Sequence, residues 1–319
     1  MTTTDDPDLL APGTFGRRIA GHYLVLAYAN LPALVMPTLH PKIAHVLSEK
    51  DRSINGSVPM DLQAGARRLF STYEMVMGIV FAGPEAAEVA HGLNELHRPI
   101  AGTMPDGSAY HAWNKDVWNW TWGGILKGGL DIYDELVGFK GDQREQAYLA
   151  LREIGRRYGV RDLAPTYAEF EAYWQEVVDT TLEVGPEVRF ITEHGLRLDK
   201  PRGGQWLPMP LWRLVSLPLA RTLRVGVLIA VPEKFHAELG LRTTRVDLLE
   251  RRLHGLVMRG LGLRVGGMFG PTYFALRRRF GNPGWRTVYS RATLEAKRAE
   301  HDAARHDARS ASVGGHAGH

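Results

Sequence analysis

The most constraining feature of this sequence is an apolar period of three to four residues, which recurs along most of its length. The period is clearest in residues 62–82, where the apolar side chains fall on one face of a helix. This stripe consists of Leu62, Ala66, Leu69, Tyr73, Val76 and Val80. Gly83 and Pro84 end it, and Pro84 suits the first position of a next helix, which is expected to run to His97. The chain is therefore predicted to be built from amphipathic helices.

One hairpin and several more helices are predicted after His97. Residues 99–111 contain an Asp106-Gly107 pair between two short extended segments, which is typical of a tight turn. Helices are expected over 113–137, 142–158 and 167–183, and Thr166 and Glu169 form a capping box before the last of them. After Gly185 the prolines and glycines predict an irregular surface connector as far as Pro210. Further helices are expected over 211–230, 233–239, 245–259, 268–280 and 286–303.

The fold class predicted from these segments is all-α. No stretch alternates strands with helices, and no glycine-rich phosphate loop follows a strand. We expect a single large helical domain over residues 1–303 with one short hairpin. Residues 304–319 are rich in Ser, Gly, Ala and His and have no apolar period, so they are predicted to form a disordered tail.

The chain has no cysteine, which excludes disulfides, cysteine catalysis and a thiolate ligand to haem or zinc. Its N-terminus is acidic and polar, unlike a secretory signal, which begins basic and continues apolar. The longest apolar stretches, 23–36 and 225–231, are interrupted or too short to cross about 30 Å of hydrocarbon. We therefore expect a cytoplasmic protein without a transmembrane helix.

Charge is distributed unevenly along the chain. Residues 202–309 contain 20 Lys and Arg against 8 Asp and Glu, although the net charge of the whole chain is only +4. Such a basic region attracts anionic partners, and we expect weak association with a membrane surface through residues 202–309. Nucleic acid is not the expected partner, because no zinc finger or aromatic-basic RNA-binding motif accompanies the charge. The alternative is a basic surface that meets only solvent.

Three blocks of sequence resemble one known family. The first consists of LHP at 39–41, RLFST at 68–72 and GIVF at 78–81. The second consists of HRPIAG at 97–102 and DGSAYHA at 106–112, and the third of GRRYGV at 155–160 and APTYAEFEAY at 164–173. In order and spacing they resemble the catalytic domain of the rubber oxygenases, the latex clearing protein family, which is related to fungal ER-bound haem oxygenases. The resemblance covers about residues 15–260.

The resemblance implies an all-helical domain around haem b that oxidises an apolar substrate with dioxygen. It places His97 on the distal side of the haem and Trp122 at the position of the proximal His. An indole nitrogen has no available lone pair, so Trp122 cannot ligate iron. Asn94 and Gly124 also stand where relatives often have Arg and Thr. These three departures predict an altered activity in this pocket.

The resemblance and the spacing together nominate a set of site residues. His97 and His111 are the candidate iron ligands, although His97 could instead cap the carbonyls at its helix end. Arg68 and Thr72 share a helix face and are the other candidate catalytic residues, or else an anchoring pair within a core. We expect His97 and Trp122 to face one pocket. Cofactor contacts are also expected from Asn94, Trp120 and Trp122, with a core role for the tryptophans as the alternative.

Three functions remain open at this point. The first is a haem-dependent oxygenase acting on a hydrophobic small molecule, isoprenoid or aromatic. The second is a family member without haem that binds an apolar ligand or catalyses a non-redox reaction in the same pocket. The third is a peripheral membrane or partner-binding protein that uses the basic region.

Overall fold

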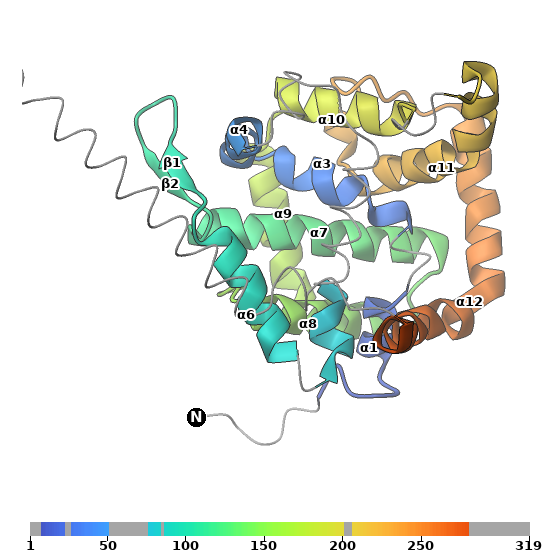
Figure 1. Ribbon diagram of the computed structural model, residues 1–319, viewed down its shortest axis with the longest axis horizontal. Helices are drawn as coiled ribbons and strands as arrows, with labels where there is room; N and C mark the ends of the chain where they lie inside the picture. The colour runs from blue at the N-terminus through green and yellow to red at the C-terminus, as the bar shows by residue number, and fades with distance from the viewer. Residues whose placement is uncertain (1–7, 23–26, 51–75, 84–85, 201–205, 281–319) are drawn as a thin grey trace, which may run out of the picture.

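The computed structural model describes residues 8–22, 27–50, 76–83, 86–200 and 206–280, and most of these residues lie in helices (Figure 1). The helices are α1 (Phe15–Ala20), α3 (Pro32–Thr38), α4 (Pro41–Lys50), α6 (Ala86–His97), α7 (Lys115–Leu136), α8 (Gln143–Arg157), α9 (Tyr167–Thr180), α10 (Pro186–Arg197), α11 (Met209–Ala230), the short 3-10 helix η3 (Glu233–Phe235) and α12 (Arg245–Phe280). The all-α prediction is confirmed.

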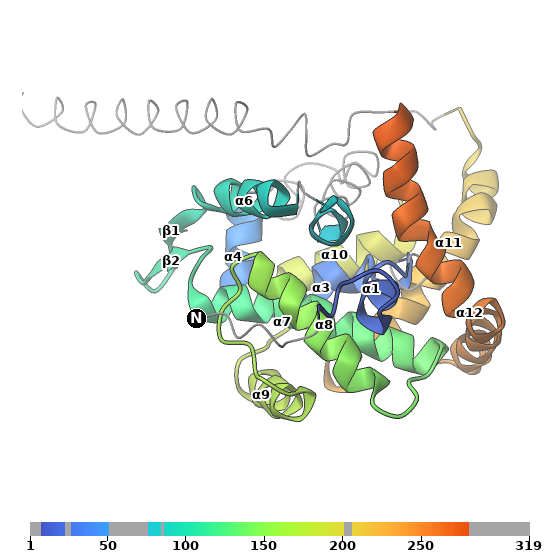
Figure 2. The same ribbon diagram turned by 90° about the horizontal axis from the view of Figure 1, so that it is seen from below.

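Helix α7 runs through the middle of the molecule and contacts α3, α8, α11 and α12 (Figures 1 and 2). Asn114 begins it, because the Asn114 side chain accepts a hydrogen bond from the amide of Asp116 at 3.1 Å. Trp120, Leu126 and Ile132 are at most 2% exposed and point in three different directions around the helix axis, so α7 contributes side chains to the core on several faces. A helix that is buried nearly all round is the natural centre of an all-α domain.

Helix α11 packs closely on the chain near Tyr28, and a glycine makes this possible. A Cβ added at Gly226 would lie 2.0 Å from the carbonyl oxygen of Tyr28, which is far inside any contact distance. Only glycine fits there. The second half of α11 is correspondingly buried, with Val225 and Val227 fully covered.

The predicted hairpin is confirmed. Strands β1 (Ala101–Thr103) and β2 (Ala109–His111) pair antiparallel, with Gly102 opposite Tyr110. Gly107 has a φ of +85°, a backbone conformation that favours glycine. The side chain of Asp106 accepts hydrogen bonds from the amide and the hydroxyl of Ser108, which closes the turn.

The capping box at α9 is also present, in a modified form. The Thr166 hydroxyl oxygen accepts from the amide of Glu169 at 3.2 Å, as expected for an N-cap. The Glu169 carboxylate, however, accepts from that hydroxyl at 3.0 Å. The predicted start of this helix is confirmed, and its end lies at Thr180 instead of residue 183.

Three sequence predictions about helices need correction. The segment after Gly185 is not an irregular connector throughout, because α10 occupies Pro186–Arg197 with Pro186 at its first turn and the side chains of Val188 and Ile191 buried. Helix α12 is continuous from Arg245 to Phe280 and does not stop at residue 259. Of the helix expected over 233–239, only η3 forms.

Some predicted features fall outside the described residues. These are most of the helix 62–82, of which residues 76–81 are helical, the helix 286–303, and the tail 304–319. Within the described ranges no helix combines the length and the apolar character needed to cross a membrane.

Candidate active site at the α6–α7–α8 junction

His97 is the last residue of α6 and is held by its own helix. Its Nδ1 lies 2.9 Å from the carbonyl oxygen of Leu93, one turn earlier. A carbonyl oxygen only accepts, so Nδ1 must be the protonated nitrogen. The neutral ring then keeps an unshared electron pair on Nε2, which is the atom that could bind a metal or accept a proton.

The protonation state of His97 follows from its surroundings. Burial lowers the pKa of His97, and the hydrogen bond to the Leu93 carbonyl only partly opposes this. The imidazole ring meets the indole of Trp118 edge to face, with ring centroids 5.0 Å apart. His97 is therefore neutral at pH 7 and lies against an aromatic surface of α7.

Trp122 lies one helical turn beyond Trp118 and faces α8. Its Nε1 donates to the carbonyl oxygen of Leu151 at 3.1 Å. A Cβ added at Gly155 would lie 2.3 Å from this nitrogen, so the indole occupies the space that a side chain at residue 155 would need. Trp122 is thus a packed contact between α7 and α8, and its only polar atom is already bonded.

Tyr158 completes this contact and is a residue that the sequence analysis did not single out. Its ring lies 5.2 Å from that of Trp122, and its hydroxyl is buried without a hydrogen-bond partner among the described residues. Full burial raises its pKa well above the ordinary value, so the phenol stays protonated and can donate. The GRRYGV block at 155–160 could have pointed to Tyr158, since the block belongs to the family resemblance and contains this tyrosine directly before Gly159.

Asn94 joins α6 to the end of α8. A Cβ at Gly159, where φ is +91°, would lie 3.5 Å from the Asn94 side-chain oxygen, so the two residues are in contact. The described contacts therefore link His97 to Trp118 on one side, and Asn94 and Trp122 to the Tyr158–Gly159 corner on the other. They show no direct contact between His97 and Trp122, and the cofactor-sized gap expected between these two stays a prediction.

Trp120 lies on another face of α7. Its ring stacks on Trp174 of α9 with centroids 4.8 Å apart, and it is only 1% exposed. This arrangement matches the core role that the sequence left open for the tryptophans. Trp120 does not join the residues gathered around His97.

His111 is a poorer ligand candidate than His97. Its Nδ1 accepts a hydrogen bond from the backbone amide of Trp113 at 3.0 Å. The neutral ring must then carry its proton on Nε2, which leaves no unshared pair on either nitrogen for a metal. His40 is in the same situation, since its Nδ1 accepts from the amide of Lys42 at 3.3 Å, and burial lowers the pKa of His40 to about 4.

The side chains available as ligands determine which residue could bind a haem iron. Within the described ranges no three or more His, Asp or Glu side chains lie together where they could hold a metal ion. Haem iron, in contrast, needs only one protein ligand such as an imidazole. His97 fits that requirement through Nε2, whereas Trp122 does not. Arg68 and Thr72, the other predicted catalytic residues, lie outside the described residues.

A second possible site, a hollow lined by arginines, is a poor candidate for binding an anionic ligand. A surface hollow of about 590 Å³ between α10 and residues 238–241 has three arginines in its wall. Arg189 pairs with Glu238, Arg197 with Glu193 and Arg224 with Asp247. Each cation already has a carboxylate partner, so this hollow offers no unpaired charge to an anionic ligand.

Comparison with known proteins identifies one family. The family described as "ER-bound oxygenase mpaB/B'/Rubber oxygenase, catalytic domain" matches residues 17–262. No curated protein and no solved structure matches the chain. The match includes α6, α7 and α8, and hence every described residue of the candidate site.

Proposed function

Because this chain belongs to the mpaB/rubber oxygenase catalytic domain family, we propose that it is an oxidoreductase of the oxygenase type that acts on a hydrophobic small molecule. The site of this activity is the α6–α7–α8 junction, and His97 is its principal functional residue. The observation that supports this assignment is the bond from His97 Nδ1 to Leu93, which leaves Nε2 with its unshared pair.

His97 is the described residue that would hold haem in this chain. Haem, when bound, supplies the dioxygen activation that side chains alone do not provide. The side chain that would bind the haem iron comes from α6, because the residue at the family's proximal position is the packed indole of Trp122. A neutral His97 suits this role, since the lowered pKa keeps Nε2 free of a proton at pH 7.

The neighbouring residues define the chemistry around the substrate. Trp118, which meets the His97 ring edge to face, offers aromatic surface that favours an apolar, isoprenoid or aromatic molecule and excludes water. The unpartnered hydroxyl of Tyr158 and the amide of Asn94 are the polar groups that could orient it. In this proposal Tyr158 donates a hydrogen bond to an oxygen atom of the bound molecule.

The test begins with the absorbance of protein purified from a haem-replete host. We expect a Soret band at close to one haem per chain. His97→Ala should abolish this band, while the matched variant His111→Ala should keep it, because His111 Nε2 carries the proton. A band that survives in His97→Ala and disappears in His111→Ala would contradict the assignment of His97.

A second candidate function is a haem-free protein that binds an apolar ligand in the same place. The specific observation that favours it is Trp122, whose indole fills the α7–α8 contact and cannot ligate iron. Colourless wild-type protein together with haem binding by Trp122→His would support this candidate over the first. Haem in the wild-type protein that depends on His97 would exclude it.

A further inference from the structure

Exposed apolar side chains are concentrated on two helices. Of the sixteen large apolar residues that are exposed in the described part of the chain, all but Leu34 and Trp113 lie between residues 206 and 261. They are Trp206, Met209, Leu211, Leu214, Val215, Leu217, Leu219, Val246, Leu248, Leu249, Leu253, Leu256, Val257 and Leu261. A surface this apolar on a folded chain indicates a binding face.

The first half of α11 and the turn just before it, which contains Trp206, contribute part of this face. Trp206 is 81% exposed and Leu214 is 66% exposed, and Arg213 is the only charged residue from 206 to 220. Pro218 lies inside the helix, and the residues that follow it turn to the core, as Val225 and Val227 show. The first half of α11 is therefore apolar without being covered by the rest of the described chain.

Helix α12 contributes the other part. Val246, Leu249, Leu253, Leu256 and Val257 recur at three- and four-residue steps and are all more than half exposed. Asp247 and Met258 lie on the opposite face and are buried. The apolar stripe of α12 thus points to solvent, which reverses the usual arrangement of an amphipathic surface helix.

A row of cations flanks this stripe. Arg245, Arg252 and Arg259 are seven residues apart, which places them along one line of the helix beside Leu249 and Leu256. All three are exposed, and no ion pair joins any of them to another described residue. An apolar stripe with arginines along its edge is typical of a helix that lies in a membrane interface.

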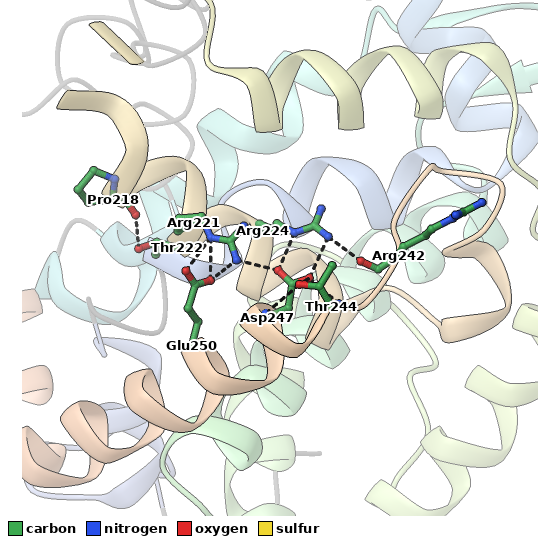
Figure 3. Close-up of polar contacts among 8 residues, drawn as sticks. All are labelled: Pro218, Arg221, Thr222, Arg224, Arg242, Thr244, Asp247 and Glu250. Carbon is green, nitrogen blue, oxygen red and sulfur yellow. Dashed lines mark hydrogen bonds and ion pairs between the residues drawn. The ribbon is translucent and has the colours of Figure 1, made fainter. Parts of the chain in front are cut away.

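The acidic residues of the same segment, Asp247 and Glu250, point toward arginines of α11 (Figure 3). Asp247 accepts from Arg221 and from Arg224, each at 2.8 Å, and Glu250 accepts from Arg221 at 2.7 Å. These are the only two carboxylates in residues 245–261, and both are bonded to α11. The outward face of α12 therefore contains apolar and cationic groups without a carboxylate.

Both views place this surface at one end of the molecule. The first half of α11 and the start of α12 lie on the right in Figures 1 and 2, away from α6 and the β1–β2 hairpin. We define the α11–α12 face as the exposed residues of 206–219 and 245–261. It is separate from the residues gathered around His97.

We propose that the α11–α12 face docks this protein on the surface of an anionic lipid bilayer. Unpaired arginines complement anionic headgroups, and exposed leucine and tryptophan side chains suit the boundary between headgroups and acyl chains. The helices lie along the interface, since no described helix is long and apolar enough to cross it. The basic residues in 202–309 add to the attraction. This proposal uses no residue of the proposed catalytic function.

The test is co-sedimentation of the full chain with vesicles of phosphatidylcholine alone and of phosphatidylcholine mixed with phosphatidylglycerol. Binding is expected only to the anionic vesicles, and it should weaken at high salt. Arg252→Gln combined with Arg259→Gln should lower the affinity about 25-fold, because each arginine near an anionic surface contributes about fivefold, or about 1 kcal/mol. Leu249→Gln combined with Leu253→Gln should also release the protein.

A matched control separates a docking face from general charge. Lys140→Gln combined with Arg161→Gln removes two exposed cations elsewhere and should change binding about twofold or less. Circular dichroism and the melting temperature confirm that each variant is folded. Failure of the wild-type chain to bind anionic vesicles would overturn the proposal. An equal loss of vesicle affinity in the Arg252–Arg259 and the Lys140–Arg161 double variants would also overturn it. A stable dimer that Leu249→Gln with Leu253→Gln converts to a monomer, without vesicle binding, would assign the face to a second copy.

Discussion

The contact between Gly155 and Trp122 can be tested with one added methyl group. In Gly155→Ala the new Cβ would lie 2.3 Å from Nε1 and 2.5 Å from Cδ1 of the indole. Carbon atoms pack at about 3.5–4.0 Å, so the indole must move by about 1 Å. Such a shift lengthens the 3.1 Å bond from Nε1 to the Leu151 carbonyl beyond hydrogen-bond range.

The size of the effect follows from three contributions to the free energy of unfolding. Overpacking costs about 1–3 kcal/mol, and the lost hydrogen bond costs about 1 kcal/mol. Replacing glycine by alanine inside a helix returns about 1 kcal/mol. Gly155→Ala should therefore destabilise the protein by about 1–3 kcal/mol.

A second background shows whether the indole is the cause. Trp122→Val removes the ring and should itself cost about 3 kcal/mol. In that background Gly155→Ala should stabilise by about 1 kcal/mol, because only the helix propensity remains, which gives a coupling of about 2–4 kcal/mol between the two sites. Urea unfolding followed by far-ultraviolet circular dichroism measures all four proteins.

Gly129 provides the matched control for this experiment. A Cβ at Gly129 on α7 meets no atom within 4 Å, so Gly129→Ala should be neutral or stabilise by about 1 kcal/mol. The reasoning is refuted if Gly155→Ala costs the same in both backgrounds, or if it stabilises the wild-type protein as Gly129→Ala does.

Two further outcomes are expected, at α12 and at α9. Asp247→Asn should lower the free energy of unfolding by about 3 kcal/mol, because it leaves Arg221 and Arg224 without their shared carboxylate. Hydrogen bonds from Arg224 and Thr244 hold the pKa of Asp247 well below its usual range, so its stabilisation is complete above the unfolded pKa of about 4 and is lost as the pH falls further. Melting temperatures of the wild-type and Asp247→Asn proteins should accordingly converge in acid, and a constant difference would exclude this ion pair as the cause. Thr166→Ala should cost about 1 kcal/mol through the lost cap of α9, against almost none for the exposed Thr180→Ala, with urea midpoints as the measurement.

Local patterns predicted much of the fold because they depend on neighbours in the sequence. The turn at Asp106-Gly107 and the cap at Thr166 each form from residues within a few positions, and both appear as expected. Helix α7 is likewise evident from its period alone. Helix α10 was missed, since the prolines and glycines after it suggested a connector, whereas the burial of Val188 and Ile191 depends on contacts with α3 and α11.

The sequence by itself determined the all-α class, the family, and the fact that residue 122 cannot ligate iron, because each of these follows from residue types and their order. Tertiary structure decided the remaining points. The carbonyl beside His97 Nδ1 and the amide beside His111 Nδ1 assign opposite tautomers to two histidines that the sequence could not distinguish. Similarly, the period of α12 defines a stripe but not its direction, and the ion pairs from Asp247 and Glu250 to α11 turn that stripe toward solvent. Which partner a side chain meets depends on segments far apart in the chain, and only packing brings these together.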